Sequence, residues 1–223
     1  MVRENKSPGK SPADLISPHD DLADLTEKVQ SCRGCDAYEH ATQAVFGEGA
    51  PRARIMLIGE QPGNREDLEG HPFVGPAGAL LSKALEQSGI DRAQVYITNV
   101  VKHFNSTRRG KLRIHKKPNA GQITACRPWL EAEIALVKPE VIICLGATAA
   151  QALIARDYRV SRQRGQLLRS DLSPMITATV HPSSILRAPD DARRHSEMQR
   201  FVTDLKTIAA ALRSHDRHES IAP

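Results

Sequence analysis

The sequence predicts an α/β fold, a single domain in which helices cover both faces of a central, mostly parallel sheet of four strands. Two observations lead to this prediction. Four short apolar or alternating runs are separated by segments with helical periodicity, an order typical of parallel strands joined by crossover helices. The length of 223 residues suits one well-buried domain and is short for two domains with a linker.

Each expected element has its own signal along the chain. Residues 1–19 contain three Ser-Pro steps and few apolar groups, so we expect a disordered N-terminal tail before a folded domain at 20–214. Helical periodicity through Leu22, Leu25 and Val29 predicts a helix at 20–30. The remaining signals predict strands at 54–59, 94–101, 141–145 and 175–180 and helices at 76–88, 119–137, 147–155 and 191–213. We expect residues 215–223 to form a charged C-terminal tail.

Composition narrows the class of protein. The formal net charge of +5 favours an anionic partner, but charge alone leaves DNA, RNA and acidic protein surfaces open. No apolar run approaches the ~20 residues that span a bilayer, and the first twenty residues lack the apolar core of a secretory signal. We therefore expect a cytoplasmic protein without a membrane partner, and a monomer.

The most basic stretch of the chain, residues 102–117, follows the second expected strand. It holds seven Lys or Arg residues, no acidic residue, and His115 near its end. It leaves the sheet at the carboxyl edge, where ligands bind in open α/β sheets. We expect it to meet a polyanion, and on charge alone His115 is one more solvated or phosphate-contacting residue of a basic loop.

Four cysteines suggest a metal centre. Cys32 and Cys35 form a Cys-x-x-Cys pair, which in a reducing compartment is more typical of a metal or redox site than of a disulfide. Cys126 is a third candidate ligand. Cys144 lies inside an apolar run that reads as a buried strand, so His103 is the favoured fourth ligand and the four-cysteine set is the alternative. These ligand types suit zinc or an iron-sulfur cluster.

Polar residues follow each of the four expected strands. Glu60 and Gln61 follow the first strand, Asn99 the second, Gly146-Ala147-Thr148 the third and His181 the fourth. The carboxyl ends of parallel strands meet at one edge, and these side chains together suit the recognition of a polar heterocycle and the stabilisation of charge on it. Gly and Pro beside them are equally compatible with ordinary tight turns. The convergence of the strand ends is what favours a site.

Four ordered motifs carry a family resemblance. They are GEQPG at 59–63, GHPFVGPAG at 70–78, YITNVVK at 96–102 and VHPSSILR at 180–187. With the cysteines they resemble the iron-sulfur branch, called family 4, of the uracil-DNA glycosylase superfamily, and so imply its fold. Gln61, His103 and the added basic loop depart from ordinary family 4 and resemble the UdgX type, which remains covalently joined to the DNA from which it removes uracil.

The resemblance implies an enzyme that excises uracil from DNA, with single strands preferred over double strands and uracil as the product. Phe73 would stack on the flipped base, Asn99 would match its imide edge, and His181 would donate to its O2 as the bond breaks. Gln61 would contact the base or a catalytic water. The substrate-binding residues implied are Gly59, Phe73, Asn99, Ser183 and Arg187.

The same resemblance assigns a nucleophile. Glu60 would accept a hydrogen bond from one nitrogen of His115, and the other nitrogen would capture the sugar cation at C1′ as a stable adduct. Ile185 and Leu186 would fill the gap left by the extruded base, Arg187 would touch phosphate, and a 4Fe-4S cluster would have a structural role. The contacts to the DNA backbone would come from Arg108, Arg109, Lys111, Arg113, Lys116 and Lys117.

Two other functions stay open on the sequence. One is a conventional family 4 glycosylase that turns over in base excision repair. The other is a non-enzymatic iron-sulfur or metal module that binds nucleic acid through the basic loop. Retention of a covalent protein-DNA adduct distinguishes the first hypothesis from both.

Overall fold

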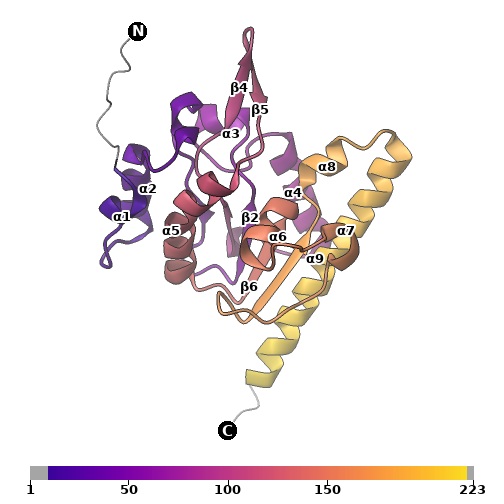
Figure 1. The fold of residues 1–223 in the computed structure, drawn as a ribbon. Coiled ribbons are helices and arrows are strands. Elements are labelled where there is room, and N and C mark those ends of the chain that lie inside the picture. The colour runs from indigo at the N-terminus through magenta and orange to yellow at the C-terminus, as the bar shows by residue number, and fades with distance from the viewer. Residues whose placement is uncertain (1–9, 220–223) are drawn as a thin grey trace, which may run out of the picture.

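The structure, a computed structural model, describes residues 10–219, and the view in Figure 1 shows a sheet enclosed by helices. The strand order is β1-β3-β2-β6-β7, and β3, β2, β6 and β7 are parallel. The prediction of a mostly parallel sheet flanked by helices is confirmed. The structure adds a short antiparallel edge strand, β1, that the sequence analysis did not predict. The strands are β1 Glu48–Gly49, β2 Ile55–Gly59, β3 Val95–Asn99, β6 Val141–Leu145 and β7 Met175–Thr179.

Alternate residues of each buried strand contribute to two apolar layers, because successive strand side chains point to opposite faces. Met56 and Ile58 of β2 belong to the layer that contains Trp129 of α5, whereas Leu57 belongs to the layer that contains Phe201 of α9. The strands are therefore continuous apolar runs, as expected for a parallel sheet covered on both faces. The helices of the two layers include α4 Pro76–Ser88, α5 Ala120–Val137, α6 Ala147–Leu153, α8 Pro182–Leu186 and α9 Asp191–Glu219.

The boundaries expected for the N-terminal and C-terminal tails both differ in the structure. The helix α1 lies within the segment expected to be a tail, and its Pro12 is buried. The long α9 continues to Glu219, past the expected start of the C-terminal tail, while residues 1–9 and 220–223 lie outside the described residues. The remaining short helices are α1 Pro12–Leu15, α2 Leu22–Lys28, α3 Asn64–Glu69 and α7 Val160–Gln163.

The basic stretch forms a β-hairpin and not an irregular loop. Its strands β4 Ser106–Arg109 and β5 Leu112–His115 are antiparallel and turn at Gly110, whose φ is 62°. Figure 1 shows the hairpin projecting from the body of the protein, next to the end of the sheet. Among the helices of residues 10–219, none combines the length and the apolar character required to cross a membrane.

Candidate active site at the carboxyl edge of the sheet

A cavity of about 700 Å³ opens where β2, β3, β6 and β7 end. Its walls bring together most of the residues that the sequence predicted for catalysis and substrate binding. Gly59 lies beneath them at the end of β2, where a Cβ atom would sit 2.3 Å from Oδ1 of Asn99. A glycine there lets the Asn99 side chain lie against the β2 backbone. The predicted residues that line the cavity are Glu60, Gln61, Phe73, Asn99, His115, His181, Ser183 and Arg187.

Glu60 and His115 form the contact that the sequence analysis expected. Nε2 of His115 lies 3.3 Å from Oε1 of Glu60, and Thr148 at the start of α6 donates a hydrogen bond to Oε2. Burial opposes ionisation of this carboxyl, but the hydrogen bonds from His115 and Thr148 outweigh it and lower the pKa of Glu60. The Glu60 carboxylate is therefore ionised at neutral pH and holds one ring nitrogen of His115.

His181 is held in a single orientation at the start of α8. The backbone N–H of Ser183 donates to Nδ1 of His181 at 3.1 Å, and the Ser183 hydroxyl lies 2.8 Å from the same nitrogen. Because Nδ1 accepts the amide hydrogen bond, the neutral ring carries its proton on Nε2. Burial lowers the pKa of His181 to about 4, so the neutral ring persists at physiological pH. His181 can therefore donate a hydrogen bond from Nε2 without carrying a charge.

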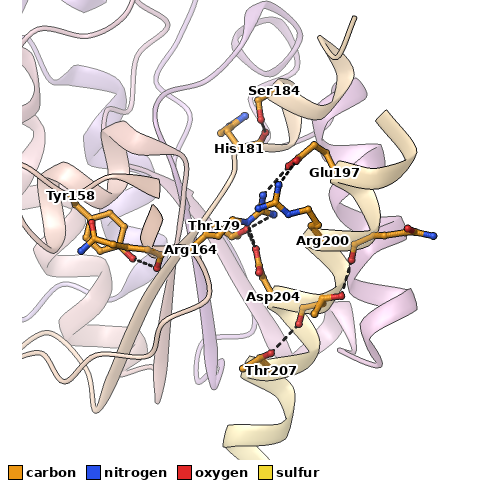
Figure 2. A network of polar contacts seen from close by, with 12 residues as sticks. Tyr158, Arg164, Thr179, His181, Ser184, Glu197, Arg200, Asp204 and Thr207 are labelled. Carbon is orange, nitrogen blue, oxygen red and sulfur yellow. Dashed lines mark hydrogen bonds and ion pairs between the residues drawn. The ribbon is translucent and has the colours of Figure 1, made fainter. Parts of the chain in front are cut away.

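A partly buried ionic cluster fixes the strand that delivers His181. Arg164 donates to Asp204 of α9 at 2.7 Å and to Glu197 at 2.8 Å, and the Thr179 hydroxyl at the end of β7 also donates to Asp204. Figure 2 shows this network between β7 and α9, with His181 and Ser184 just beyond it. The carboxyl end of β7 is thereby tied to α9 immediately before the histidine.

Asn99 is 2% exposed, and its Oδ1 accepts no hydrogen bond from the part of the chain that the structure describes. A buried acceptor without a partner is costly, which makes such an atom a candidate for ligand contact. The backbone carbonyl of Asn99 accepts a hydrogen bond from Nζ of Lys102 at 2.7 Å. The end of β3 is thus braced from within the protein while the amide faces the cavity.

Phe73 lies in the cavity wall with a backbone φ of 57°, a left-handed conformation uncommon outside glycine. Its ring stacks on that of His181 at a centroid distance of 5.8 Å. The loop carrying Phe73 is held by Glu66, whose Oε1 accepts the backbone N–H of Gly75 at 2.8 Å. Glu66 also lines the cavity, and the sequence analysis missed it because no strand ends at that position. Its only signal in the sequence is a carboxylate between two of the family motifs.

The amide nitrogen of Gln61 is hydrogen-bonded within the protein, and its expected contact with the base or a catalytic water stays a prediction. Nε2 of Gln61 donates to the backbone carbonyls of Asn105 and Lys116, at 3.1 and 3.2 Å, which flank the hairpin on its two sides. Oε1 is buried and accepts no hydrogen bond within residues 10–219. Gln61 therefore joins the root of the hairpin to the cavity wall, and its oxygen is the group of this side chain that has no hydrogen-bond partner in the described residues.

Two of the seven cationic residues in the basic stretch are internal. The guanidinium of Arg113 pairs with the fully buried carboxylate of Asp67 and also donates to Oδ1 of Asn64, so the predicted contact with DNA phosphate is replaced by a contact within the protein. Lys102 is fully buried and pairs with Glu133. The cationic side chains left exposed on the hairpin and its flanks are those of Arg108, Arg109, Lys111, Lys116 and Lys117.

Ile185 and Leu186, which were expected to fill the gap left by the extruded base, differ in exposure. Ile185 is 1% exposed and packs into the core layer beneath α4 and α9, so it cannot enter DNA. The prediction for Ile185 was wrong because α8 turns that position inward. Leu186, on the same short helix, is 37% exposed beside the cavity residues Ser184 and Arg187.

Comparison with known proteins identifies the family. The family model described as "Uracil DNA glycosylase superfamily" matches residues 46–206. This range includes all five strands of the main sheet and every cavity residue named above. The chain belongs to this superfamily. A type-4 uracil-DNA glycosylase of Thermotoga maritima is 36% identical over 181 residues, 81% of this chain and 88% of the relative.

Two other relatives are also uracil-DNA glycosylases. A type-4 uracil-DNA glycosylase of Sulfurisphaera tokodaii is 35% identical over 179 residues, 77% of this chain and 78% of the relative. A type-5 uracil-DNA glycosylase of Thermus thermophilus is 33% identical over 127 residues, 50% of this chain and 54% of the relative. These matches confirm the family resemblance, and the UdgX type, which is a finer distinction, stays a prediction.

A second, small cavity of the glycosylase-like domain gathers the favoured metal ligands. Cys32, Cys35, His103 and Cys126 all line it, whereas Cys144 lies within β6 and does not. The Cys32 sulfur accepts a hydrogen bond from Nε1 of Trp129 at 3.3 Å, and the Cys126 sulfur accepts one from the backbone N–H of Lys102 at 3.2 Å. Such donors stabilise thiolate ligands.

The donor set is of the kind that binds zinc or an iron-sulfur cluster. Across residues 10–219, no three His, Cys, Asp or Glu side chains are grouped closely enough to hold one metal ion. Ligands of a cluster bind different iron atoms and are spaced farther apart than those of one zinc. Burial, with a smaller contribution from Arg33, lowers the pKa of His103 to about 4, which keeps the imidazole in the neutral form that binds metals.

Proposed function

We propose that the chain is a uracil-DNA glycosylase that captures the sugar left after excision on His115. The observation that carries the first part is one cavity in which Asn99, Phe73 and His181 present an unpartnered amide oxygen, an aromatic ring and a neutral N–H donor. The type-4 uracil-DNA glycosylases that match most of the chain support the same activity.

Uracil fits this arrangement by its hydrogen-bonding edge. Its N3–H can donate to Oδ1 of Asn99, and its O4 can accept from the amide nitrogen of the same side chain. Cytosine lacks the N3 proton and presents an amino group in place of O4, so it would leave the buried Asn99 oxygen unpaired and oppose the amide nitrogen with another donor. The Phe73 ring supplies a flat apolar face for the extruded base.

Bond cleavage uses His181. As the bond between C1′ and N1 breaks, the electron pair goes to the uracil ring, and negative charge gathers on O2 and N1. The N–H of His181 at Nε2 donates to O2 and stabilises the departing anion, while the Glu60 carboxylate lies where it can stabilise positive charge on the sugar. Neither the hydrogen bond to O2 nor the stabilisation of the sugar by Glu60 requires His181 to be charged.

The capture step uses His115. Its Nε2–H donates to Glu60, which leaves the lone pair of the ring on Nδ1. This lone pair forms the new bond to C1′, the proton at Nε2 passes to Glu60, and the uracil anion takes a proton from solvent. The product is an N-glycosidic adduct, and the protein acts once.

Conventional turnover is the second candidate. The relatives carry the name of glycosylases, and an ionised Glu60 in the cavity could equally orient a water toward C1′. In that case the protein would release both uracil and DNA. The His115 side chain, which is 50% exposed, would then only help to hold the hairpin through its contact with Glu60.

A denaturing gel distinguishes covalent capture on His115 from conventional turnover. The protein is incubated with a uracil-containing single-stranded oligonucleotide and heated before electrophoresis. We expect a band of retarded mobility that His115→Ala abolishes while uracil release continues. Uracil release without a retained band in the unmodified protein would establish turnover and exclude capture, and no uracil release at all would exclude the glycosylase.

We also propose that Cys32, Cys35, His103 and Cys126 bind a 4Fe-4S cluster with a structural role. The small cavity that all four line, together with the two N–H donors to sulfur, supports this set over the one with Cys144. When bound, the cluster would pin the N-terminal segment that carries Cys32 and Cys35 to α5 and to the exit of β3. The reaction above uses no electron from it.

A further inference from the structure

The hairpin presents an apolar ridge outside the cavity. Leu112 is 67% exposed and Ile114 is 43% exposed, and Leu112 is the most exposed large apolar side chain in the described part of the chain. Both belong to one strand, β5, which has four residues. Single exposed leucines are ordinary on protein surfaces, but two on one short projecting strand form a continuous feature.

The pairing of the hairpin directs the ridge away from the protein. The register places Ile114 opposite Thr107 and Leu112 opposite Arg109, so these four side chains share one face. The other face carries Arg113 and His115, which contact Asp67 and Glu60 of the body. The hairpin is thus attached to the protein through one face, and its apolar face is left without cover by residues 10–219.

The charge around the ridge selects its partner. Exposed cationic side chains lie beside it at Arg109, Lys111 and Lys116, and the stretch from residue 102 to residue 117 has no acidic residue. A surface that is apolar along its centre and cationic at its rim matches a partner with flat apolar groups between phosphates. Single-stranded DNA is such a partner, because its bases are unstacked and accessible, whereas a duplex shows only base edges.

The position of His115 ties the ridge to the site. His115 is the last residue of β5 and lines the cavity, and Ile114 and Leu112 precede it on the same strand. We propose that Leu112 and Ile114 contact the bases of single-stranded DNA next to the nucleotide in the cavity, while the surrounding Arg and Lys side chains contact its phosphates. The inference rests on the proposed function only in taking DNA as the molecule that enters the cavity.

The ridge gives the protein a source of strand preference. Leu186, an exposed apolar residue, is the last residue of α8 and precedes Arg187, which lines the cavity. An extruded uracil would then have apolar contacts to its neighbours from two elements, the hairpin and α8. Contacts of the hairpin with base faces are available in a single strand and not in a paired duplex, so they favour single-stranded substrate.

The test measures binding and not excision. The variant Leu112→Thr with Ile114→Thr keeps β-branched or strand-compatible side chains in β5 and removes apolar surface. Affinity is measured by fluorescence anisotropy for a single-stranded oligonucleotide that contains thymine and no uracil, and for its duplex, over a series of salt concentrations. Leu168→Thr is the matched control, since Leu168 is also extended and exposed but pairs near the start of β7, away from the cavity.

We expect the double variant to bind the single strand about tenfold more weakly and the duplex as before, with an unchanged salt slope because no cation is removed. Leu112→Tyr provides the opposite change, because an aromatic ring stacks on bases and should tighten single-strand binding. A gain of affinity cannot arise from an unfolded hairpin. The control Leu168→Thr should match the unmodified protein.

Other results would overturn the inference. An equal loss on single strand and duplex would assign the ridge to backbone contact, and unchanged binding in both the Thr and the Tyr variants would remove DNA as its partner. Self-association of the unmodified protein that the double variant abolishes, measured by sedimentation, would assign the ridge to a second copy of the chain. Because the oligonucleotide lacks uracil, a protein that binds as expected but releases no uracil would refute the proposed function and leave the ridge in place.

Discussion

Nε2 of His115 lies 3.3 Å from Oε1 of Glu60, and this contact joins the last residue of the hairpin to the first residue after β2. A projecting two-stranded ribbon is marginally stable alone. Here its root is held by Glu60 through His115, by Asp67 through Arg113 and by Gln61 through two backbone carbonyls. The same contacts that order the hairpin also set the position of the proposed nucleophile.

Replacing Glu60 by Gln tests the contact directly. The amide has nearly the same shape but cannot take the proton from Nε2 of His115 or offset positive charge on the sugar. We expect adduct formation on a uracil-containing single strand to slow by about 100-fold, in the range typical for loss of a positioned base. The rate is followed by denaturing gel over time, with His115→Ala as the variant that forms no adduct. An undiminished rate in Glu60→Gln would show that Glu60 does not act on the nucleophile.

Substitutions of Arg113 and Lys116 should have different effects on the salt dependence of DNA binding, although both residues belong to the basic stretch. Arg113 pairs with Asp67, which is fully buried, whereas Lys116 is exposed. Lys116→Gln should reduce the slope of log affinity against log salt by about 0.7 on a single strand, as for one lost phosphate contact. Arg113→Gln should leave the slope unchanged and lower thermal stability and adduct yield, because Asp67 loses its counter-ion. A changed slope in Arg113→Gln would return this residue to the DNA interface.

The sequence was most informative where residues follow buried strands. Asn99 and His181 could be placed because an apolar strand must end at its edge of the sheet, and polar side chains after several strands then converge. Arg113 could not be placed, since its partner Asp67 lies 46 residues earlier in the chain and no local pattern connects them. Ile185 was misplaced because a helix of five residues is too short for periodicity to reveal its buried face.

The sequence analysis did not predict the helix α1 or the hairpin β4–β5. Ser11 caps α1 and Pro12 occupies its first turn, so this Ser-Pro step is a helix start, although in a polar context it reads as disorder. The hairpin was read as a loop because the charged residues of β4 and β5 mask the alternation of Thr107, Leu112 and Ile114. Tertiary contacts at the hairpin root decide its conformation.

The proposed cluster assigns different roles to two cysteines, of which the sequence analysis took Cys126 as a ligand and left Cys144 only as the alternative to His103. Cys126 lines the small cavity, whereas Cys144 is enclosed in β6. We expect Cys126→Ala to remove bound iron and sulfide and Cys144→Ala to retain both, with a cost in stability from the lost side-chain volume. Analysis of iron and sulfide per chain in protein purified without oxygen measures this. Loss of iron from Cys144→Ala with retention in Cys126→Ala would reverse the assignment.

A buried ion pair links the small cavity to the active site. Lys102 and Glu133 have fully buried side chains and pair with each other, and Lys102 also donates to the Thr98 hydroxyl and to the Asn99 carbonyl. Lys102→Met would leave the Glu133 carboxylate buried without a counter-ion, so we expect the free energy of unfolding to fall by about 3–5 kcal/mol in urea titrations. Adding Glu133→Gln should recover part of the loss, because the remaining group is neutral. A single variant as stable as the unmodified protein would show that the pairing of Lys102 with Glu133 does not stabilise the fold.

The neutral state of His181 should appear as a dependence of stability on pH. Burial lowers its pKa to about 4 in the folded protein, whereas an exposed imidazole titrates near 6.5, so the unfolded chain binds more protons between these values. The stabilisation due to neutral His181 is therefore complete above about 6.5 and lost as pH falls toward about 4. His181→Asn can still accept the N–H of Ser183 as a helix cap but does not titrate. In urea titrations from about pH 7 to pH 5, we expect the unfolding free energy of the unmodified protein to fall relative to this variant by about 1–3 kcal/mol, the effect of a shift of this size when partly developed. A difference that stays constant with pH would mean that His181 titrates alike in both states and that burial does not lower its pKa.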